Sequence, residues 1–223
     1  MSEETPNVSG EAEQPADAEQ SEHYFSADPQ AAFKRIPVKA NVWGTWLELT
    51  SGSGVFSQGR LDSGTGVLLR EVQPPEGAAE VLDLGCGYGV IALAVAVAVP
   101  GARVTAVDVN ERALALTREN ADAIGVADRI EAALPDEVDP ERTYDEIWSN
   151  PPIRIGKEAL HALLLQWLPR LRPGGRMVMV VGKNLGADSL AGWLTEQGYP
   201  TERLASAKGF RVLEARASSD AQA

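Results

Sequence analysis

The chain has 223 residues, 44% of them hydrophobic, which suits one α/β domain with a substantial core. No apolar run is long enough to span a membrane, and the acidic start does not resemble a signal peptide. A single cysteine, Cys86, excludes an internal disulfide and fits a reducing compartment. We therefore expect a cytoplasmic protein that does not associate with membranes.

The net charge of −12 argues at first against a nucleic-acid partner. Seven of the acids, however, lie in residues 1–22, which contain no Lys or Arg, so the rest of the chain carries −5. The same segment is rich in Ser, Pro, Gln and Ala and predicts a disordered acidic leader. If the fold brings the remaining Lys and Arg residues together, a positively charged surface patch can form on this acidic protein.

Residues 23–60 predict a β-rich extension ahead of the main domain. Two expected strands, Ile36–Asn41 and Thr45–Thr50, flank a turn at Gly44. A helix is expected over Leu61–Val72, with Asp62 or Ser63 as its N-cap.

From Glu80 onward, strands and helices alternate with short loops. The expected strands are Glu80–Leu84, Arg103–Val109, Arg129–Ala133, Tyr144–Ser149, Arg176–Val181, Glu202–Ala205 and Phe210–Ala215. The expected helices are Val90–Val99, Glu111–Ile124, Lys157–Leu171 (stopped by Pro173-Gly174-Gly175) and Asp188–Gln197. This order predicts an α/β, Rossmann-like fold with a mostly parallel seven-stranded sheet, helices on both faces and an antiparallel edge pair. We assign one domain to residues 23–216 and a flexible tail to residues 217–223.

A glycine-rich turn follows the first strand of this alternating region. Gly85, Gly87 and Gly89 allow the backbone to turn tightly and to approach a ligand without a Cβ clash. Asp108 ends the next strand, where a carboxylate can accept hydrogen bonds from two ribose hydroxyls. The pattern therefore indicates a nucleotide-containing cofactor, which can be a nicotinamide dinucleotide or S-adenosylmethionine.

Three details favour S-adenosylmethionine. The glycine spacing is G-x-G-x-G, not G-x-G-x-x-G, and no Lys, Tyr or His for hydride chemistry is evident after it. Asp83 directly precedes the turn, where an acid suits a cationic amino-acid head group better than a pyrophosphate. The simpler alternative for Asp83, and similarly for Asp108, is a purely structural acid such as a helix cap. Cys86 is a small residue in a tight turn and not a nucleophile.

The segment Asn150-Pro151-Pro152-Ile153 follows a strand and predicts a binding site for a planar amine. The amide oxygen of Asn150 and the carbonyl oxygen of Pro151 provide two acceptors for the two hydrogens of an –NH₂ group. Binding both hydrogens would direct the nitrogen lone pair toward a methyl donor and favour the positive charge that develops on nitrogen. Ile153 can lie against the ring of the acceptor. The structural alternative for this segment is a strand stopped by two prolines, and the glycine turn upstream makes that alternative weaker.

With these motifs, the chain resembles the class I methyltransferases that modify a guanine N2 in small-subunit ribosomal RNA. The resemblance covers roughly residues 23–214. It rests on His23-Tyr24-Phe25, Gly54-Val55-Phe56-Ser57, Leu61-Asp62-Ser63-Gly64-Thr65, Asp83 to Gly89, Asp108-Val109-Asn110, Asn150 to Arg154 and Lys208-Gly209-Phe210.

The resemblance implies S-adenosylmethionine as cofactor, no metal, and ribosomal RNA or the assembling small subunit as partner. The cofactor residues that we expect are Asp83, Gly85, Cys86, Gly87, Gly89, Asp108, Val109, Asn150 and Thr65. The catalytic residues that we expect are Asn150, Pro151, Pro152 and Ile153. For contact with the RNA we expect Arg60, Arg154, Lys157 and Lys208, with ordinary solvated surface charge as the alternative for each.

Two departures from the family pattern stand out. Two-domain relatives carry a second, degenerate methyltransferase-like domain, for which we expect this chain to be too short. Many relatives also place an acid after the third strand to meet the adenine amine of the cofactor. Here the corresponding stretch is Ala132 to Asp136, so that either Asp136 substitutes through a longer loop or the contact is missing.

Three other functions stay open at this point. Methylation of a protein glutamine and methylation of adenine N6 use the same planar-amine chemistry, but both usually place an aromatic residue where this chain has Ile153. A protein that binds S-adenosylmethionine without catalysis and assists ribosome assembly is the third alternative. The intact Asn-Pro-Pro segment disfavours that last one.

Overall fold

The computed structural model describes residues 33–57, 59–77 and 79–219. The predicted acidic leader and the end of the predicted tail lie outside the described residues. The strands are β1 (Arg35–Val42), β2 (Thr45–Gly52), β3 (Glu80–Leu84), β4 (Arg103–Val107), β5 (Ile130–Ala133), β6 (Tyr144–Ser149), β7 (Leu171–Gly182), β8 (Thr201–Ala207) and β9 (Phe210–Arg216). The α-helices are α2 (Ser63–Glu71), α3 (Val90–Ala98), α4 (Glu111–Ile124), α5 (Lys157–Trp167) and α6 (Ala187–Glu196).

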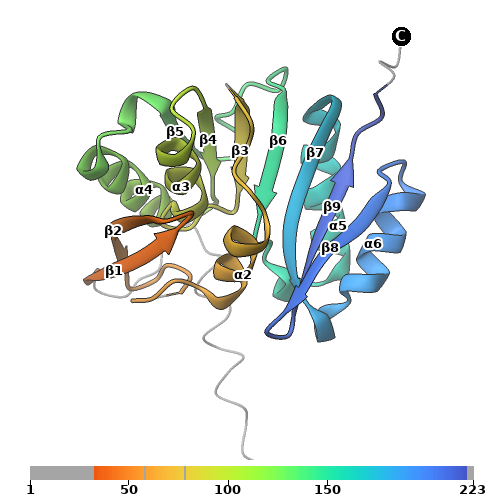
Figure 1. Ribbon diagram of the computed structural model, residues 1–223, viewed down its shortest axis with the longest axis horizontal. Coiled ribbons are helices and arrows are strands. Elements are labelled where there is room, and N and C mark those ends of the chain that lie inside the picture. Colours follow the sequence, from red (N-terminus) through yellow and green to blue (C-terminus); the bar gives the residue numbers. More distant parts are fainter. Residues whose placement is uncertain (1–32, 58, 78, 220–223) are drawn as a thin grey trace, which may run out of the picture.

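Seven of these strands form one sheet in the order β5-β4-β3-β6-β7-β9-β8. The five strands from β5 to β7 are parallel, and β9 runs antiparallel to both β7 and β8. The predicted fold is therefore confirmed, including the antiparallel pair at one edge. The chain builds outward from β3 to β5 and then returns to lay β6 on the other side of β3 (Figure 1). The reversal of strand order between β3 and β6 is where open α/β sheets bind their ligands.

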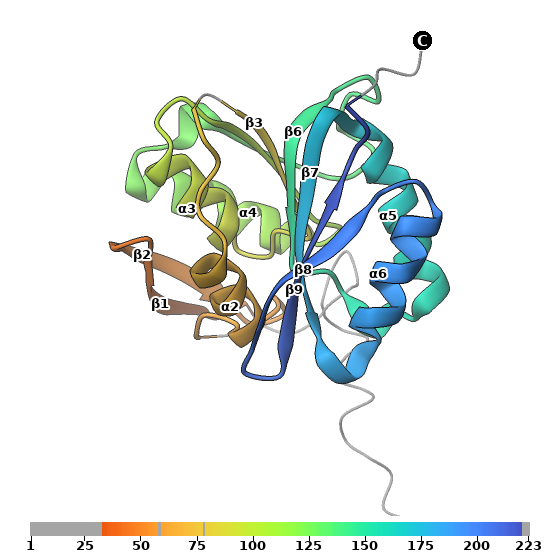
Figure 2. The same ribbon diagram turned by 45° about the vertical axis from the view of Figure 1, so that its right-hand side comes forward.

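Helices cover both faces of the sheet, as Figure 2 shows with the sheet nearly edge-on. One hydrophobic cluster joins the sheet to the β1–β2 hairpin, α2, α3 and α4, and it includes the wholly buried Leu93 and Trp148. The other joins the sheet to α5 and α6, around Trp167 and Leu194. No helix in the described part of the chain is long and apolar enough to cross a membrane.

The hairpin of β1 and β2 is a separate two-stranded sheet that packs on the α4 side of the domain. The side-chain amide of Asn120 in α4 holds the hairpin in place through two hydrogen bonds to Thr50. Oδ1 of Asn120 accepts from the Thr50 amide at 2.7 Å, and Nδ2 donates to the Thr50 carbonyl at 2.9 Å. The loop that leaves the hairpin reaches Gly54, whose carbonyl accepts from Asn110 Nδ2 at 2.8 Å. The extension thereby brings residues 53–57 and 59–62 to the ligand-binding edge of the main sheet.

Several predicted boundaries were wrong, and those of α5, β7 and β4 bear on the sheet and the site. Helix α5 ends at Trp167 and passes through a 3-10 turn directly into β7, which begins at Leu171 and contains the Pro-Gly-Gly segment predicted to be a loop. The sheet tolerates this segment because the register between β6 and β7 shifts between Tyr144 and Glu146. Strand β4 ends at Val107, two residues earlier than predicted, so Asp108 already belongs to the loop after the strand.

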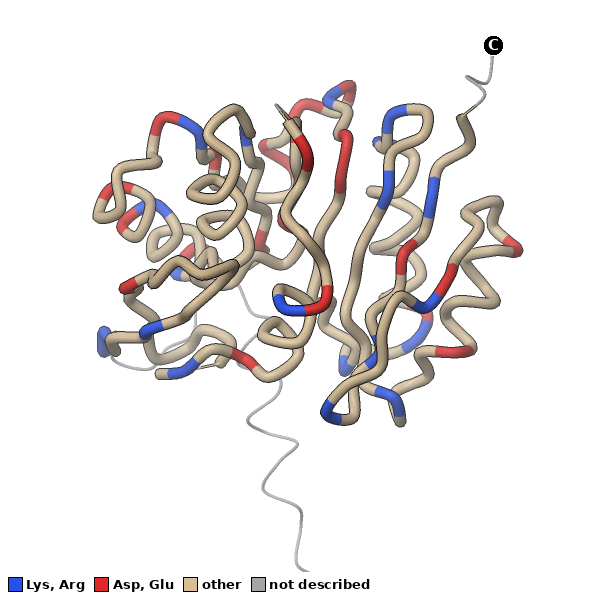
Figure 3. Tube along the Cα trace, viewed as in Figure 1, with Lys and Arg blue, Asp and Glu red and all other residues tan. Residues whose placement is uncertain are grey.

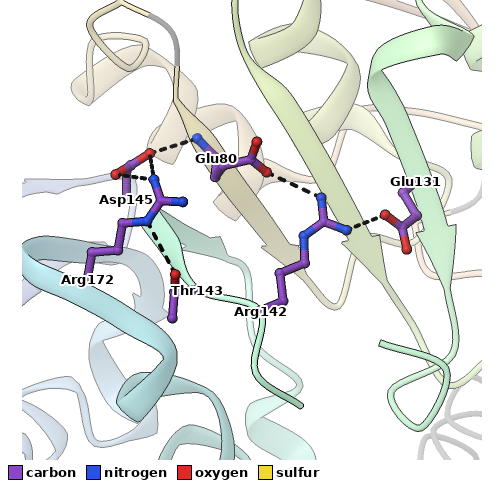
Figure 4. A network of polar contacts seen from close by, with 6 residues as sticks. All are labelled: Glu80, Glu131, Arg142, Thr143, Asp145 and Arg172. Atoms are coloured by element: carbon purple, nitrogen blue, oxygen red, sulfur yellow. Dashed lines mark hydrogen bonds and ion pairs between the residues drawn. The ribbon is translucent and has the colours of Figure 1, made fainter. Parts of the chain in front are cut away.

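The amino-terminal edge of the sheet is held by a network of ion pairs (Figure 4). Arg142 bridges Glu80 at the start of β3 and Glu131 in β5. Asp145 in β6 accepts from the Glu80 backbone amide at 2.8 Å and from the Arg172 guanidinium at 2.8 Å. Both arginines of this network are therefore neutralised by neighbouring acids.

Candidate cofactor and acceptor site

The glycine turn and the Asn-Pro-Pro segment leave the sheet side by side. Strands β3 and β6 are parallel neighbours in which Leu84 pairs with Ser149, the last residue of each strand. The Ser149 hydroxyl donates to the Leu84 carbonyl at 2.7 Å and fixes this register. Gly85 and Asn150 are the next residues along each strand, and both line one pocket at the point where the strand order reverses.

The glycine turn forms an open cradle. Gly85 and Gly87 adopt left-handed backbone angles, with φ of 78° and 57°, which favour glycine. A Cβ added to either residue would meet no atom within 4 Å, so their outward side faces free space. The Gly85 and Cys86 amides donate to the Val107 carbonyl at 2.8 and 3.0 Å, which fastens the turn to the end of β4.

Asp108 shapes the same turn from the next strand. One of its carboxylate oxygens accepts from the Gly87 amide at 2.9 Å, and the other accepts from the Asn110 amide at 2.9 Å. Burial raises the pKa of Asp108, while these amide hydrogen bonds lower it. Each oxygen keeps a further lone pair. The carboxylate therefore both orders the turn and remains able to accept from a ligand.

Asp83 lies beneath the turn, inside the protein. The residue is fully buried and does not line the pocket. Its Oδ2 accepts from the Ala92 amide at 2.9 Å in the first turn of α3, whereas Oδ1 has no partner among the described residues. Burial, with a smaller contribution from Asp108, raises the pKa of Asp83 to about 7. The structural alternative foreseen for this residue, an acid at the start of a helix, is thus present in the structure.

Asn150 faces helix α2 with its amide nitrogen. Nδ2 donates to Asp62 Oδ1 at 2.7 Å and to Thr65 Oγ1 at 3.0 Å. Within the described residues, no hydrogen bond occupies Oδ1 of Asn150, and the residue lines the pocket. The side chain therefore presents an acceptor at the cradle formed by the glycine turn.

The two prolines form a compact turn after β6. The Ile153 amide donates to the Pro151 carbonyl at 2.8 Å, and Pro152 between them has the φ of −74° and ψ of 75° of an inverse γ-turn. One lone pair of the Pro151 oxygen is thus used within the chain, and the second is left. Ile153 is half-buried against the cluster around α5 and α6.

Several residues that line the pocket were not among the predicted site residues. They are Phe56, Ser57, Tyr88, Val90 and Ile91. Asp62 also lines the pocket; the resemblance implied that the Asp62–Thr65 segment packs near the methionine end of the cofactor, without assigning a role to Asp62 itself. Phe56 is 46% exposed, and Ser57 has a left-handed φ of 57°, which is uncommon for a residue other than glycine. Both lie in a loop whose path depends on the hairpin packing against α4. The family resemblance includes this stretch, but local sequence patterns do not predict that it reaches the pocket.

Comparison with known proteins settles the family. A family model described as the methyltransferase small domain matches residues 46–214. The chain belongs to the methyltransferase small domain family. The predicted resemblance to class I methyltransferases is thereby confirmed.

The relatives of this family member include proteins of two lengths. A Bacillus subtilis protein described as uncharacterized, YbxB, is 33% identical over 88% of this chain and 98% of its own length. The ribosomal RNA small subunit methyltransferase C of Chromohalobacter salexigens is 38% identical over 86% of this chain, but only 56% of its own length is covered. The same enzyme of Pseudomonas aeruginosa is 35% identical, with 77% and 52% covered. The chain thus spans about half the length of the named methyltransferases.

Among solved structures, the 16S rRNA N2 methyltransferase of T. thermophilus, in complex with AdoMet and guanosine, superposes with a TM-score of 0.72 at 25% identity. The match covers 85% of this chain and 52% of that chain. The mitomycin 7-O-methyltransferase MmcR has a TM-score of 0.58 at 22% identity, over 69% of this chain and 55% of that one, and shows the shared fold alone.

The structure of this methyltransferase small domain brings together only part of the predicted site. Thr65, Gly85, Cys86, Gly87 and Asn150 line the pocket. The predicted cofactor residues that lie outside the pocket lining are Asp83, Gly89, Asp108 and Val109. Burial raises the pKa of the Cys86 thiol well above its ordinary value, in keeping with a packing role.

The predicted RNA-contacting cations lie around the pocket and not inside it. Arg154 and Lys157 are exposed just beyond the two prolines, and Arg60 is exposed just before α2. Lys208 occupies the β8–β9 turn with a left-handed φ of 49° and lines a groove of about 540 Å³ beside α2. Among the described residues, these four have no ion-pair partner, in contrast to the cations in Figure 4. Figure 3 shows where the charged residues lie along the chain, with basic residues near the β8–β9 turn and both signs of charge along the opposite edge of the sheet.

Proposed function

We propose that this protein transfers a methyl group from S-adenosylmethionine to an exocyclic amine of a nucleobase, guanine N2 in small-subunit ribosomal RNA. The observation that carries the proposal is the acceptor oxygen of Asn150, which stands at the cradle formed by the glycine turn. The named relatives support ribosomal RNA as substrate, and the T. thermophilus structure with AdoMet and guanosine supports guanine. We place the protein in the cytoplasm, where this RNA is made in bacteria.

The residues of the pocket fit S-adenosylmethionine. The free space over Gly85 and Gly87 admits a ligand against the backbone. Asp108, in the loop directly after β4, suits the ribose hydroxyls. Asp83 lies buried beneath the turn, and its unpartnered Oδ1 can supply a negative charge near the positive end of the cofactor. The proposed cofactor set is completed by Cys86, Gly89, Val109 and Thr65. When bound, the cofactor supplies an electrophilic methyl group on a sulfonium.

Asn150 and Pro151 orient the acceptor. Their oxygens accept the two hydrogens of the planar amine, which directs its lone pair out of the ring plane and toward the cofactor side of the pocket. The same two acceptors favour the positive charge that grows on nitrogen as it is methylated. A strong general base is not required, because the nitrogen becomes acidic after methylation and loses its proton to solvent. Pro152 holds the turn, and Ile153 lies against the acceptor ring.

The four unpaired cations bind the RNA outside the pocket. Arg60, Arg154, Lys157 and Lys208 offer positive charge to backbone phosphates, which supplies affinity without reading sequence. A guanine in folded RNA has to leave its stack before its amine can reach Asn150.

The test is tritiated-methyl transfer from S-adenosylmethionine to three substrates from a strain lacking the protein: naked small-subunit RNA, small subunits and a protein extract. We expect label in RNA that digests to N2-methylguanosine. Label in N6-methyladenosine would replace guanine by adenine as the target. Label only in protein would move the chain to the glutamine-methylating enzymes, and no label in any substrate would favour a non-catalytic assembly factor.

Asn150→Ala provides the matching variant. Turnover should fall by orders of magnitude while calorimetry shows nearly unchanged affinity for S-adenosylmethionine. Gln166→Ala, which removes an exposed amide from α5, is the control and should behave as the wild type. A loss of less than about tenfold, roughly 1.4 kcal/mol of barrier, would contradict the amine-binding role of Asn150.

A further inference from the structure

The amide of Asn150 is held by helix α2, a part of the chain far away in sequence. Its Nδ2 donates to Asp62 Oδ1 at 2.7 Å and to Thr65 Oγ1 at 3.0 Å. The same Asp62 oxygen accepts from the Thr65 backbone amide at 2.9 Å as the N-cap of α2, and it lies 3.5 Å from the Thr65 hydroxyl. Three groups from two segments thus meet at one wall of the pocket.

The chemistry of these partners determines which way the amide of Asn150 faces. An ionised carboxylate such as Asp62 can only accept hydrogen bonds. The Thr65 hydroxyl, whose proton is directed toward Asp62, offers a lone pair to Asn150. Rotating the amide by half a turn would place Oδ1 of Asn150 against Asp62 Oδ1, which cannot donate, and would draw the Thr65 proton away from Asp62. Only one orientation therefore satisfies all three groups. In that orientation both Nδ2 hydrogens are bound, and Oδ1 faces away from α2.

The amino-terminal end of α2 is itself firmly placed. The carbonyl of Arg60 accepts from the Tyr88 hydroxyl at 3.0 Å and from the Ser57 hydroxyl at 3.0 Å, which fixes the segment just before the helix. Gly64 approaches the ring of Phe210 so closely that an added Cβ would lie 3.1 Å from it. Asp62 and Thr65 are therefore fixed to the glycine turn on one side and to β9 on the other.

We infer that Asp62 and Thr65 are positioning residues for Asn150, which hold its amide so that Oδ1 faces the acceptor amine. The inference rests on the proposed function, because it names what orients the acceptor in that same site. The negative charge of Asp62 also polarises the amide, which makes Oδ1 a stronger acceptor for an amine on which positive charge develops. A preset orientation removes the cost of fixing the amide at the moment of reaction.

Thr65→Val tests the orientation with little change in side-chain volume. It removes one of the two acceptors for Nδ2, so turnover on the RNA, measured at saturating S-adenosylmethionine, should fall about tenfold or more. Measuring at saturation separates this loss from any loss of cofactor affinity, since Thr65 also belongs to the proposed cofactor set. Thr65→Ser, which keeps the hydroxyl, should recover most of the turnover lost in Thr65→Val. Equal turnover in the two variants, at matched melting temperatures, would overturn the inference. Asp62→Asn can place its amide oxygen where Asp62 Oδ1 lies, so that it keeps the hydrogen-bond geometry but loses the charge. Its turnover should therefore lie between those of Thr65→Val and Thr65→Ser.

Nuclear magnetic resonance provides a readout that does not depend on activity. In the wild type, both side-chain amide protons of Asn150 should be protected from exchange with water. Protection of at least one proton should be lost in Thr65→Val and regained in Thr65→Ser. Unprotected protons in the wild type would overturn the inference even if the RNA is methylated. Protected protons in a protein that methylates no RNA would instead refute the proposed function and leave the positioning role intact.

Discussion

Replacing Asp83 by Asn should stabilise the protein, and more so at higher pH. Asp83 is fully buried with one unpartnered oxygen, and burial raises its pKa from 3.8 to about 7. A carboxyl group whose pKa is higher in the folded than in the unfolded state binds protons more tightly when folded. Its contribution to stability is full below the unfolded pKa and is lost as the pH rises through the folded pKa. The loss amounts to roughly 4 kcal/mol above pH 8 and to about half of that at pH 5.5.

Asn is a neutral side chain of the same shape, so Asp83→Asn should escape this loss. Urea unfolding of both proteins at pH 5.5 and 8.5 measures the effect, and the advantage of the variant should grow by about 2 kcal/mol between the two values. Asp122→Asn, which removes one exposed charge from α4, should show no comparable growth. An equal stability difference at both pH values would refute the reasoning, because Asp83 would then ionise as an ordinary exposed acid. If ionised Asp83 also faces the cationic end of S-adenosylmethionine, saturating cofactor should stabilise the wild type more than the variant at pH 8.5.

Three further outcomes are expected. Asp108→Ala should weaken binding of S-adenosylmethionine by about tenfold or more in calorimetry, because the ribose acceptor and the support of the Gly87 amide are lost together; unchanged affinity would defeat the assignment. Lys208→Asn should stabilise the β8–β9 turn by about 1 kcal/mol, since Asn tolerates left-handed backbone, while its RNA binding weakens and becomes less sensitive to salt. Lys208→Arg should bind RNA like the wild type. Normal RNA binding by a stable Lys208→Asn variant would remove Lys208 from the interface. Arg142→Gln should cost about 1 kcal/mol in urea unfolding and leave turnover unchanged, and a large loss of turnover would show that the two edges of the sheet are coupled.

The fold was predictable because the sequence alternates two hydrophobic periods with few irregularities. The placement of the two main motifs followed from the same pattern. Residues that follow parallel strands collect at one edge of the sheet, so a glycine turn after β3 and Asn150 after β6 were expected to meet there. The Pro-Gly-Gly segment misled the prediction of β7, because composition carries no information about a register shift in a neighbouring strand.

Details of the site that depend on side-chain direction were beyond the sequence. The identity of Asp83 was noted, but whether its carboxylate reaches a ligand or the Ala92 amide depends on which way a buried strand residue points. The partners of Asn150 lie 85 and 88 positions away in α2, and no local pattern links them. Asp62 was expected as an N-cap, yet its second hydrogen bond, to Asn150, becomes visible only when the helix is packed against the end of β6.

One oxygen atom of Asp62 accepts both the hydrogen bond that begins helix α2 and the one that holds the amide of Asn150. Any substitution of Asp62 therefore changes both the stability of α2 and the orientation of Asn150. Screens for heat-resistant variants of this domain should therefore leave position 62 unchanged even where better helix-capping residues exist. Conversely, variants that lose activity through a change at this position should also be less stable. Such variants should show both lower activity and a lower amount of protein in cells.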